Sequence, residues 1–232
     1  MRHSNRFFIT ATLFGFLAHS AFSAETPDDG LVRRGSKKVH SIALTFDVCY
    51  NTKTEFDAPV VDTLEQTHTA ATFLVSARWA EIQKEAFKRL SSNPDFEIEG
   101  HGFYHPHMDQ VTDERLEREM TRMQATFKKL LGHPVTYFRP PFGEYNEKVV
   151  QSAKKHGLQV LLWDFPSGDP DPTRTVEKLV KGVVRQARNG SIIVFHANKR
   201  GVHTAEALPA IIQKLKEKGF KFVTVSELMS EK

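Results

Sequence analysis

The sequence predicts a single α/β domain built as an irregular seven-stranded (β/α) barrel, a distorted form of the TIM barrel. Two observations support this prediction. Short apolar runs alternate with helical stretches along nearly the whole chain, which indicates a parallel sheet with right-handed crossovers. Single polar residues follow several of these runs, where the strands of a barrel would open onto one face. The 232 residues are enough for one large domain with its own core.

The alternation assigns the elements in turn. Apolar runs predict strands at residues 41–46, 71–75, 96–98, 135–138, 160–163, 192–195 and 220–224. Apolar residues at helical spacing predict helices at residues 58–66, 77–90, 112–131, 147–156, 175–187 and 204–218, with a short final helix near Ser226. Asp113 and Glu114 suit the first turn of the third helix, and Gly157 and Gly219 end two of the others.

The polar residues after the strands distinguish a barrel from a doubly wound sheet. They are Asp47, His101, Arg139, Asp169 and His196, each shortly after a predicted strand. In a parallel barrel all strand carboxyl ends meet at one face, so these five loops would converge on one site. A doubly wound sheet gathers ligands only where its strand order reverses. The distribution of these residues therefore favours the barrel.

The amino terminus has the layout of a secretory signal peptide. Arg2 and Arg6 precede an apolar stretch over residues 7–17, and small residues follow up to Ser23. The alternative is a membrane anchor, but the apolar stretch is too short to span a bilayer comfortably. We therefore expect a signal peptide over residues 1–23, a linker over residues 24–38 and one folded domain over residues 39–232.

Composition restricts the functional classes. Hydrophobic residues make up 40% of the chain and charged residues 26%, which is typical of a globular protein. Without residues 1–23 the chain has 30 basic and 28 acidic residues, so its formal charge of +2 gives no indication of nucleic-acid binding. Cys49 is the only cysteine, which excludes an intrachain disulfide. These features fit a periplasmic or secreted protein with no membrane span after cleavage of the signal.

The string Gly-His-Gly-Phe-Tyr-His-Pro-His is the most informative feature of the chain. His101 and His105 lie four residues apart, so both imidazoles can point at one divalent metal of the zinc type. Taken alone, such a pair is often only a surface feature. The carboxylate of Asp47 and the imidazole of His196 add the acid–base groups that metal-assisted hydrolysis needs.

Five motifs in order make the chain resemble the NodB-homology polysaccharide deacetylases, carbohydrate esterase family four. They are Leu-Thr-Phe-Asp ending at Asp47, the histidine string, Arg-Pro-Pro-Phe-Gly from Arg139, Ser-Gly-Asp ending at Asp169, and Ile-Val-Phe-His ending at His196. The resemblance covers about residues 38–232. It implies a NodB-type barrel and a hydrolase that removes N-acetyl groups from an N-acetylglucosamine-containing polysaccharide, either peptidoglycan or a chitin-like polymer.

The resemblance also implies a role for each matching residue. Asp47 would be the general base, and Arg139 would keep its carboxylate charged and correctly oriented. His196 would be the general acid, paired with Asp169. The backbone amide of Phe142 would help to hold the oxyanion.

The metal site departs from the family pattern at its third ligand. His101 and His105 match the family's ligands, for zinc or alternatively cobalt or nickel, but Val48 stands where the family has a metal-binding aspartate. Valine cannot ligate a metal, so three outcomes are open. In order of preference, the histidines act with Asp47 or water, the metal and the activity are lost, or Cys49 supplies a thiolate.

Other departures leave functional alternatives open. Gly102 replaces the family's Ser or Thr, Pro170 replaces a tryptophan and Val194 replaces a leucine. One alternative is a glycan-binding pseudoenzyme that uses the same cleft without chemistry. Another is a hydrolase of a different amide, an imide or an O-acetyl ester. His203 is a further candidate for the site, and the only partner expected is the polysaccharide, with the oligomeric state undetermined.

Overall fold

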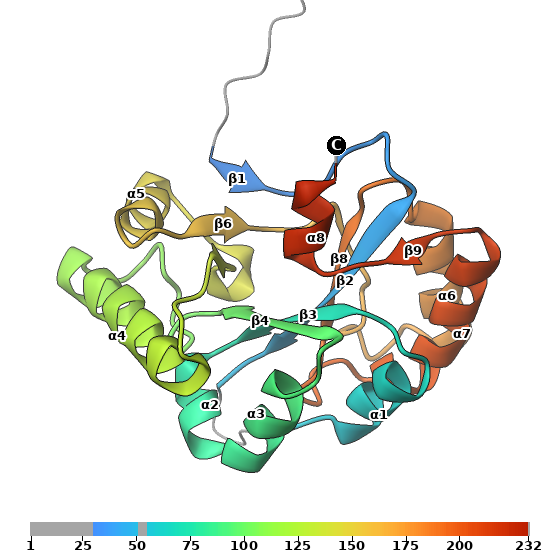
Figure 1. Ribbon diagram of the computed structural model, residues 1–232, viewed down its shortest axis with the longest axis horizontal. Helices are drawn as coiled ribbons and strands as arrows, with labels where there is room; N and C mark the ends of the chain where they lie inside the picture. The colour runs from blue at the N-terminus through green and yellow to red at the C-terminus, as the bar shows by residue number, and fades with distance from the viewer. Residues whose placement is uncertain (1–29, 51–54, 232) are drawn as a thin grey trace, which may run out of the picture.

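The computed structural model describes residues 30–50 and 55–231 and shows a curled parallel sheet surrounded by helices, an irregular (β/α) barrel (Figure 1). The expected signal peptide lies outside the described residues. All seven predicted strands are present: β2 (Ser41–Val48), β3 (Ala71–Val75), β4 (Phe96–Gly100), β5 (Tyr137–Phe138), β6 (Gln159–Leu161), β8 (Ile192–His196) and β9 (Lys221–Phe222). Two short strands add to them, β1 (Leu31–Val32) and β7 (Phe165–Pro166).

The strand order confirms the barrel. Hydrogen-bonded neighbours follow the order β1-β6-β5-β4-β3-β2-β8-β7, with β9 beside β2, and every pair is parallel. Strands β2 to β6 succeed one another without the reversal that a doubly wound sheet would show. Arg34, just after β1, forms an antiparallel bridge with Ser191, just before β8, so the N-terminal segment spans the opening between β6 and β8.

This N-terminal segment differs from the expected linker over residues 24–38. Leu31 and Val32 form β1 on the free edge of β6, and the carbonyl of Val32 accepts a 2.7 Å hydrogen bond from the amide of Leu162. An open strand edge leaves backbone groups unsatisfied, and pairing with this segment satisfies them. A strand of two residues is too short to show a period in the sequence.

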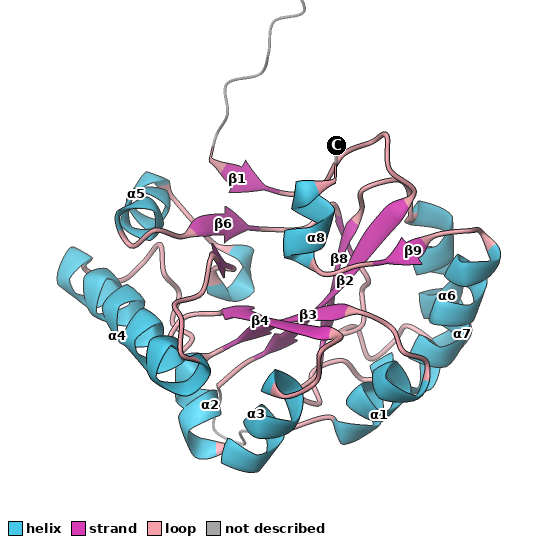
Figure 2. Cartoon of the chain, viewed as in Figure 1, coloured by secondary structure: helices cyan, strands magenta, loops and turns pink. Residues whose placement is uncertain are grey.

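Helices cover the outer face of the sheet (Figure 2). They are α1 (Ala58–Gln66), α2 (Ala77–Ile82), α3 (Lys84–Ser91), α4 (Asp113–Leu131), α5 (Glu147–Lys155), α6 (Val176–Gln186) and α7 (Thr204–Glu217). Helix α8 (Val225–Ser230) lies apart from them, against the inner face of the sheet. The helix expected over residues 77–90 is two helices, because the backbone of Gln83 (φ −94°, ψ 56°) leaves the helical region. Among the described helices, none has the length and apolar character that crossing a bilayer requires.

Alternation along β2 separates two cores. Ile42, Leu44, Phe46 and Val48 lie in the large apolar cluster between the sheet and the helices. Ala43 faces the other way, into a smaller cluster to which Val225 and Leu228 of α8 also belong. Helix α8 therefore closes the amino-terminal end of the barrel. Thr45 and Asp47 continue the inward-facing row toward the carboxyl end, where the polar residues gather.

Candidate active site

A cavity of about 150 Å³ opens at the carboxyl end of the sheet and collects residues from the ends of several strands and from the loops that follow them. The sequence-predicted residues that line it are Asp47, Cys49, His101, His105, Phe142, Asp169 and His196. Arg139 is fully buried and contacts this cavity through Asp47. His203 does not line the cavity. It lies at the start of α7, with its Nδ1 3.7 Å from Oε2 of Glu206.

Asp47 and Arg139 form a buried ion pair on one side of the cavity. Arg139 Nη1 donates a 2.7 Å hydrogen bond to Asp47 Oδ1, while its Nη2 donates to Thr45 Oγ1 and to the carbonyl of Leu162. Burial alone would raise the pKa of Asp47, but the neighbouring Arg139 cation, which also donates a hydrogen bond to this carboxylate, is the main influence that outweighs burial and lowers the pKa. Asp47 is therefore a carboxylate with one oxygen free to accept a proton.

His196 and Asp169 form a second pair on another side. Asp169 Oδ1 lies 2.9 Å from His196 Nδ1, and Asp169 Oδ2 accepts hydrogen bonds from the His196 amide and from Thr204 Oγ1, both at 2.7 Å. Asp169 is almost fully buried, while His196 is partly exposed to the cavity. The carboxylate thus fixes the tautomer and the ring orientation, which leaves His196 Nε2 directed at a substrate. The hydroxyl of Thr204 was not predicted from the sequence.

His101 and His105 are suited to hold a metal. The Nδ1–H of His101 donates to the carbonyl of Arg139 at 2.8 Å, so its Nε2 keeps a free lone pair, 3.8 Å from Asp47 Oδ2. Burial is the main reason that the pKa of His101 falls below its ordinary value, and burial followed by the neighbouring His101 lowers the pKa of His105 to about 3. Both rings are therefore neutral near pH 7, the form that ligates metals.

The third donor near the histidines is Cys49. The Cys49 sulfur, one ring nitrogen of His101 and one ring nitrogen of His105 all lie within 4.8 Å of one another. Together they would offer a divalent ion one sulfur and two nitrogen donors, a set that suits zinc. Val48 is fully buried in the outer core and faces away from the cavity.

A buried glutamate supports the loop that carries both histidines. Glu119 of α4 accepts hydrogen bonds from the backbone amides of Phe103 (2.9 Å) and Tyr104 (2.8 Å) through one oxygen, Oε2, and its other oxygen lies 3.0 Å from Arg115. Glu119 is 2% exposed. The spacing of apolar residues along α4 predicts an apolar side chain at this buried position. An acidic residue there is the one feature of the sequence that could have indicated a supporting role for Glu119.

Backbone strain surrounds the cavity. His105 (φ 64°) and Phe142 (φ 61°) line it and adopt the left-handed conformation that residues other than glycine rarely accept. Phe142 is 43% exposed and contacts the ring of His105, with centroids 4.7 Å apart. Gly143 follows with a positive φ, and a Cβ at that position would collide with the Trp163 ring. Strain of this kind is typical of functional loops.

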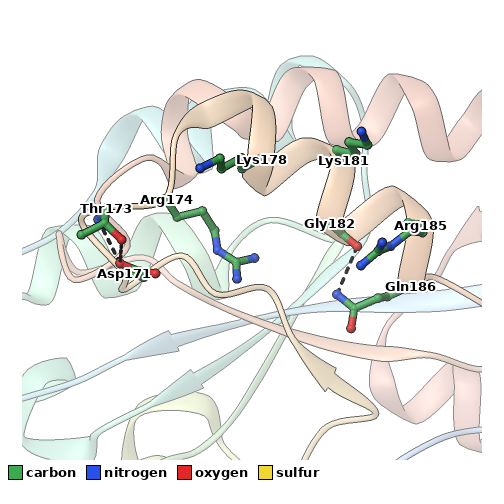
Figure 3. A pocket seen from close by; sticks show the side chains of 8 residues that line it. All are labelled: Asp171, Thr173, Arg174, Lys178, Lys181, Gly182, Arg185 and Gln186. Carbon is green, nitrogen blue, oxygen red and sulfur yellow. Dashed lines mark hydrogen bonds between the residues drawn. The ribbon is translucent and has the colours of Figure 1, made fainter.

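A larger, cationic depression lies along α6 and the loop before it (Figure 3). It has a volume of about 390 Å³, and its basic side chains are Arg174, Lys178, Lys181 and Arg185. Arg174 donates to the carbonyl of Ser167 at 3.1 Å, which ties the depression to the active-site loop. The depression was not anticipated from the sequence, because its basic residues read as the solvated face of a helix.

Fold and site together define a class of protein: a (β/α) barrel whose carboxylate and imidazole side chains gather in one cavity at the carboxyl ends of the strands. Residues 34–161 match the polysaccharide deacetylase family. A peptidoglycan-N-acetylglucosamine deacetylase from Bacillus cereus is 33% identical over 194 residues, which cover 82% of this chain and 89% of that protein. The chain therefore belongs to the polysaccharide deacetylase family, hydrolases that act on carbon–nitrogen bonds.

Solved structures agree with this assignment. A peptidoglycan N-acetylglucosamine deacetylase in complex with an N-oxidanyl-benzamide superimposes with a TM-score of 0.78 and 25% identity, over 88% of this chain and 94% of that chain. A pseudoenzyme of carbohydrate esterase family 4 from Bacillus anthracis has a TM-score of 0.77 and 23% identity, over 87% of this chain and 69% of that chain. At that identity the pseudoenzyme shows the fold alone, so its side chains and activity are not transferred to this chain.

Proposed function

We propose that this protein is an exported, metal-dependent deacetylase that removes N-acetyl groups from N-acetylglucosamine residues of peptidoglycan. The observation that carries the proposal is the division of the cavity. The ion-paired carboxylate of Asp47 lies on one side, the Asp169-oriented imidazole of His196 on another, and two neutral imidazoles complete the wall. Base, acid and ligands in one small cavity are the set that hydrolysis of an acetamide requires.

The residues of the chain divide the reaction between them. Asp47 takes a proton from the attacking water as the new bond to the acetyl carbon forms. Arg139 keeps that carboxylate ionised and fixed before the attack. The backbone amide of Phe142 donates to the oxygen that becomes negative. His196 then gives a proton to the sugar nitrogen as the carbon–nitrogen bond breaks, which yields acetate and a free amine.

His101 and His105 would hold the metal, with zinc the best match to their nitrogen donors and cobalt or nickel as substitutes. When bound there, a divalent ion supplies Lewis acidity that polarises the acetamide carbonyl and makes water more acidic. The hydrogen bond from His101 Nδ1 to the Arg139 carbonyl couples this metal site to the residue that orients the base.

The cationic depression favours peptidoglycan over a chitin-like polymer. Four basic side chains lie beside the loop of Asp169, whereas the carboxylate of Asp171 is already engaged by Thr173. Peptidoglycan carries carboxylates on its muramic acid and peptide side chains, whereas chitin is neutral. The Bacillus cereus relative is likewise named for peptidoglycan N-acetylglucosamine. The depression would attract the anionic polymer and hold it along α6.

The direct test is acetate release by the protein without residues 1–23, on purified peptidoglycan and on a chitin oligosaccharide. Asp47→Asn and His196→Ala should each abolish release without loss of fold. The matched control is His203→Ala, which removes an imidazole outside the cavity and should retain activity. Normal activity in Asp47→Asn would rule out the mechanism, and preference for the chitin oligosaccharide would rule out the choice of polymer.

The second candidate function is a glycan-binding pseudoenzyme. Val48 in place of the family's metal-binding aspartate favours it, because this side chain lies in the apolar core and cannot reach the cavity. Metal content separates the two functions without a choice of substrate. About one zinc per wild-type chain after dialysis, lost in His101→Ala, supports the enzyme. No zinc in either protein, together with peptidoglycan binding and no acetate release, supports the pseudoenzyme.

A further inference from the structure

Cys49 occupies the position from which a third ligand would complete the metal site. Its sulfur belongs to the three-donor group with the imidazoles of His101 and His105, and the residue is 5% exposed, so the sulfur is nearly shielded from bulk solvent. Cys49 lines the active-site cavity and belongs to neither apolar core cluster. A cysteine that served only as a small apolar filler would belong to one of those clusters.

The direction of the Cys49 side chain follows from the strand before it. Strand β2 is extended through Val48, and successive side chains of an extended strand point to opposite faces. Asp47 points into the cavity and Val48 into the outer core, so the next inward position belongs to Cys49. The ligand lost from the family pattern at position 48 is thus replaced one residue later, on the correct face.

The alternative third ligand is Asp47, and its carboxylate is already committed. Arg139 holds Oδ1 of Asp47 at 2.7 Å, and the same guanidinium is fixed by Thr45 and Leu162. Asp47 is also absent from the three-donor group. A carboxylate that acts as the base needs its second oxygen for the proton, whereas Cys49 has no other task in the site.

A second observation points to a ligand at the same place. Asn198 is 2% exposed. Its side-chain Oδ1 and Nδ2 have no hydrogen-bond partner among the residues that the structure describes. Burial, followed by the charge of Asp47, raises the pKa of the Cys49 thiol, and the nearby Asn198 side chain acts in the opposite direction. Buried amides normally have partners, and groups around a metal site orient its ligands by hydrogen bonds. The amide N–H of Asn198 is available to a thiolate sulfur.

We propose that the Cys49 thiolate, together with His101 and His105, holds the divalent metal of this protein, so that cysteine replaces the carboxylate ligand of the family. The proposal rests on the proposed function for the existence of the metal site, and it adds the identity of the third ligand. A ligand set of one sulfur and two imidazole nitrogens selects zinc or cobalt over magnesium, calcium and manganese, which prefer oxygen.

The experiment uses cobalt and zinc, because a sulfur ligand has its own spectroscopic signature. Cobalt-loaded wild type should show a near-ultraviolet sulfur-to-metal charge-transfer band, and zinc-loaded protein should show one sulfur neighbour at about 2.3 Å by X-ray absorption. Cys49 is the only cysteine, so both signals report this residue alone. Cys49→Ser should lose both signals and weaken zinc binding by more than about 100-fold, beyond the usual effect of a residue that merely supports a ligand.

A further variant tests whether loss of zinc binding in Cys49→Ser comes from misfolding. The outcomes also distinguish the cysteine proposal from the proposed function. Cys49→Asp should recover zinc binding without the sulfur signals, because it returns a carboxylate ligand on the inward face. If wild type binds one metal without a sulfur signal and Cys49→Ser binds it equally well, the cysteine proposal is wrong. In that case, loss of the metal in His101→Ala would still support the proposed function. If wild type binds no metal, both proposals are wrong.

Discussion

Glu119 provides the most direct test of how the barrel positions the metal site. We expect Glu119→Ala to weaken zinc binding, although this side chain touches no ligand atom. Its Oε2 accepts the amides of Phe103 and Tyr104, which lie between the two histidines. Removal of the carboxylate leaves these amides buried without partners, and the loop then loses the constraint that holds both imidazoles toward one point.

The magnitude follows from the two hydrogen bonds. A hydrogen bond to a charged group contributes about 1.5–3 kcal/mol, so Glu119→Ala should lower the free energy of unfolding by roughly 3–5 kcal/mol. For a domain of this size, that corresponds to a fall in Tm of roughly 6–20 °C. Glu119→Gln should cost about 1 kcal/mol, because both bonds end on one oxygen and an amide oxygen can still accept them.

The assay measures unfolding by urea and zinc affinity by competition with a chromophoric chelator. We expect the affinity of Glu119→Ala to fall about 10–100-fold and that of Glu119→Gln to stay near wild type. Arg115→Ala is the matched control, because it removes the partly exposed ion partner of Glu119 but keeps both amide bonds, at a cost below about 1 kcal/mol. Wild-type zinc affinity in a folded Glu119→Ala protein would refute this reasoning.

Four further outcomes are expected. Arg139→Met should cost about 3–5 kcal/mol of stability, since it leaves Asp47 buried without its cation, and the raised pKa of Asp47 should move the acid limb of the kcat/KM profile to higher pH. Asp169→Asn should lower kcat on the order of 10²-fold or more with KM unchanged in steady-state kinetics, because His196 loses its orienting carboxylate. Treatment with a chelator should abolish acetate release, and added zinc or cobalt should restore it. Asp164→Asn should lower the free energy of unfolding by about 1–2 kcal/mol at pH 7, measured by urea titration. Burial alone would raise the pKa of Asp164, but its hydrogen bonds and a neighbouring arginine lower this pKa in the folded protein. The stability difference between variant and wild type should therefore vanish as the pH falls through the lowered pKa of Asp164.

The sequence predicted most of the fold because the elements have strong local patterns. All seven expected strands are present, and helices occupy the expected ranges, with residues 77–90 divided into two helices. The positions of the polar residues alone were enough to predict a barrel instead of a doubly wound sheet. The two additional strands, β1 and β7, are only two residues long and have no period to detect. β1 is paired with β6, far away in the chain, and β7 with β8, beyond helix α6, so only the assembled sheet gives these two strands a regular conformation.

The candidate site divides in the same way. The residues of the five motifs meet at one cavity, since each lies at or beyond the carboxyl end of a strand that opens there. Glu119 and Thr204 were not predicted, because each supports a residue far from it in sequence and no spacing reveals such a contact. His203 lies outside the cavity, since the start of α7 directs it toward Glu206.

By itself, the sequence determined the type and order of the elements, the face of the barrel where the site forms, and the family to which the chain belongs. Strand and helix periods and short motifs contain that information locally. Only the tertiary structure decided which side chains meet. Cys49 was the least favoured third ligand in the sequence, and it joins the histidines because β2 stays extended through Val48. The point where a strand ends is set by its neighbours, so the face of the next side chain depends on the whole sheet.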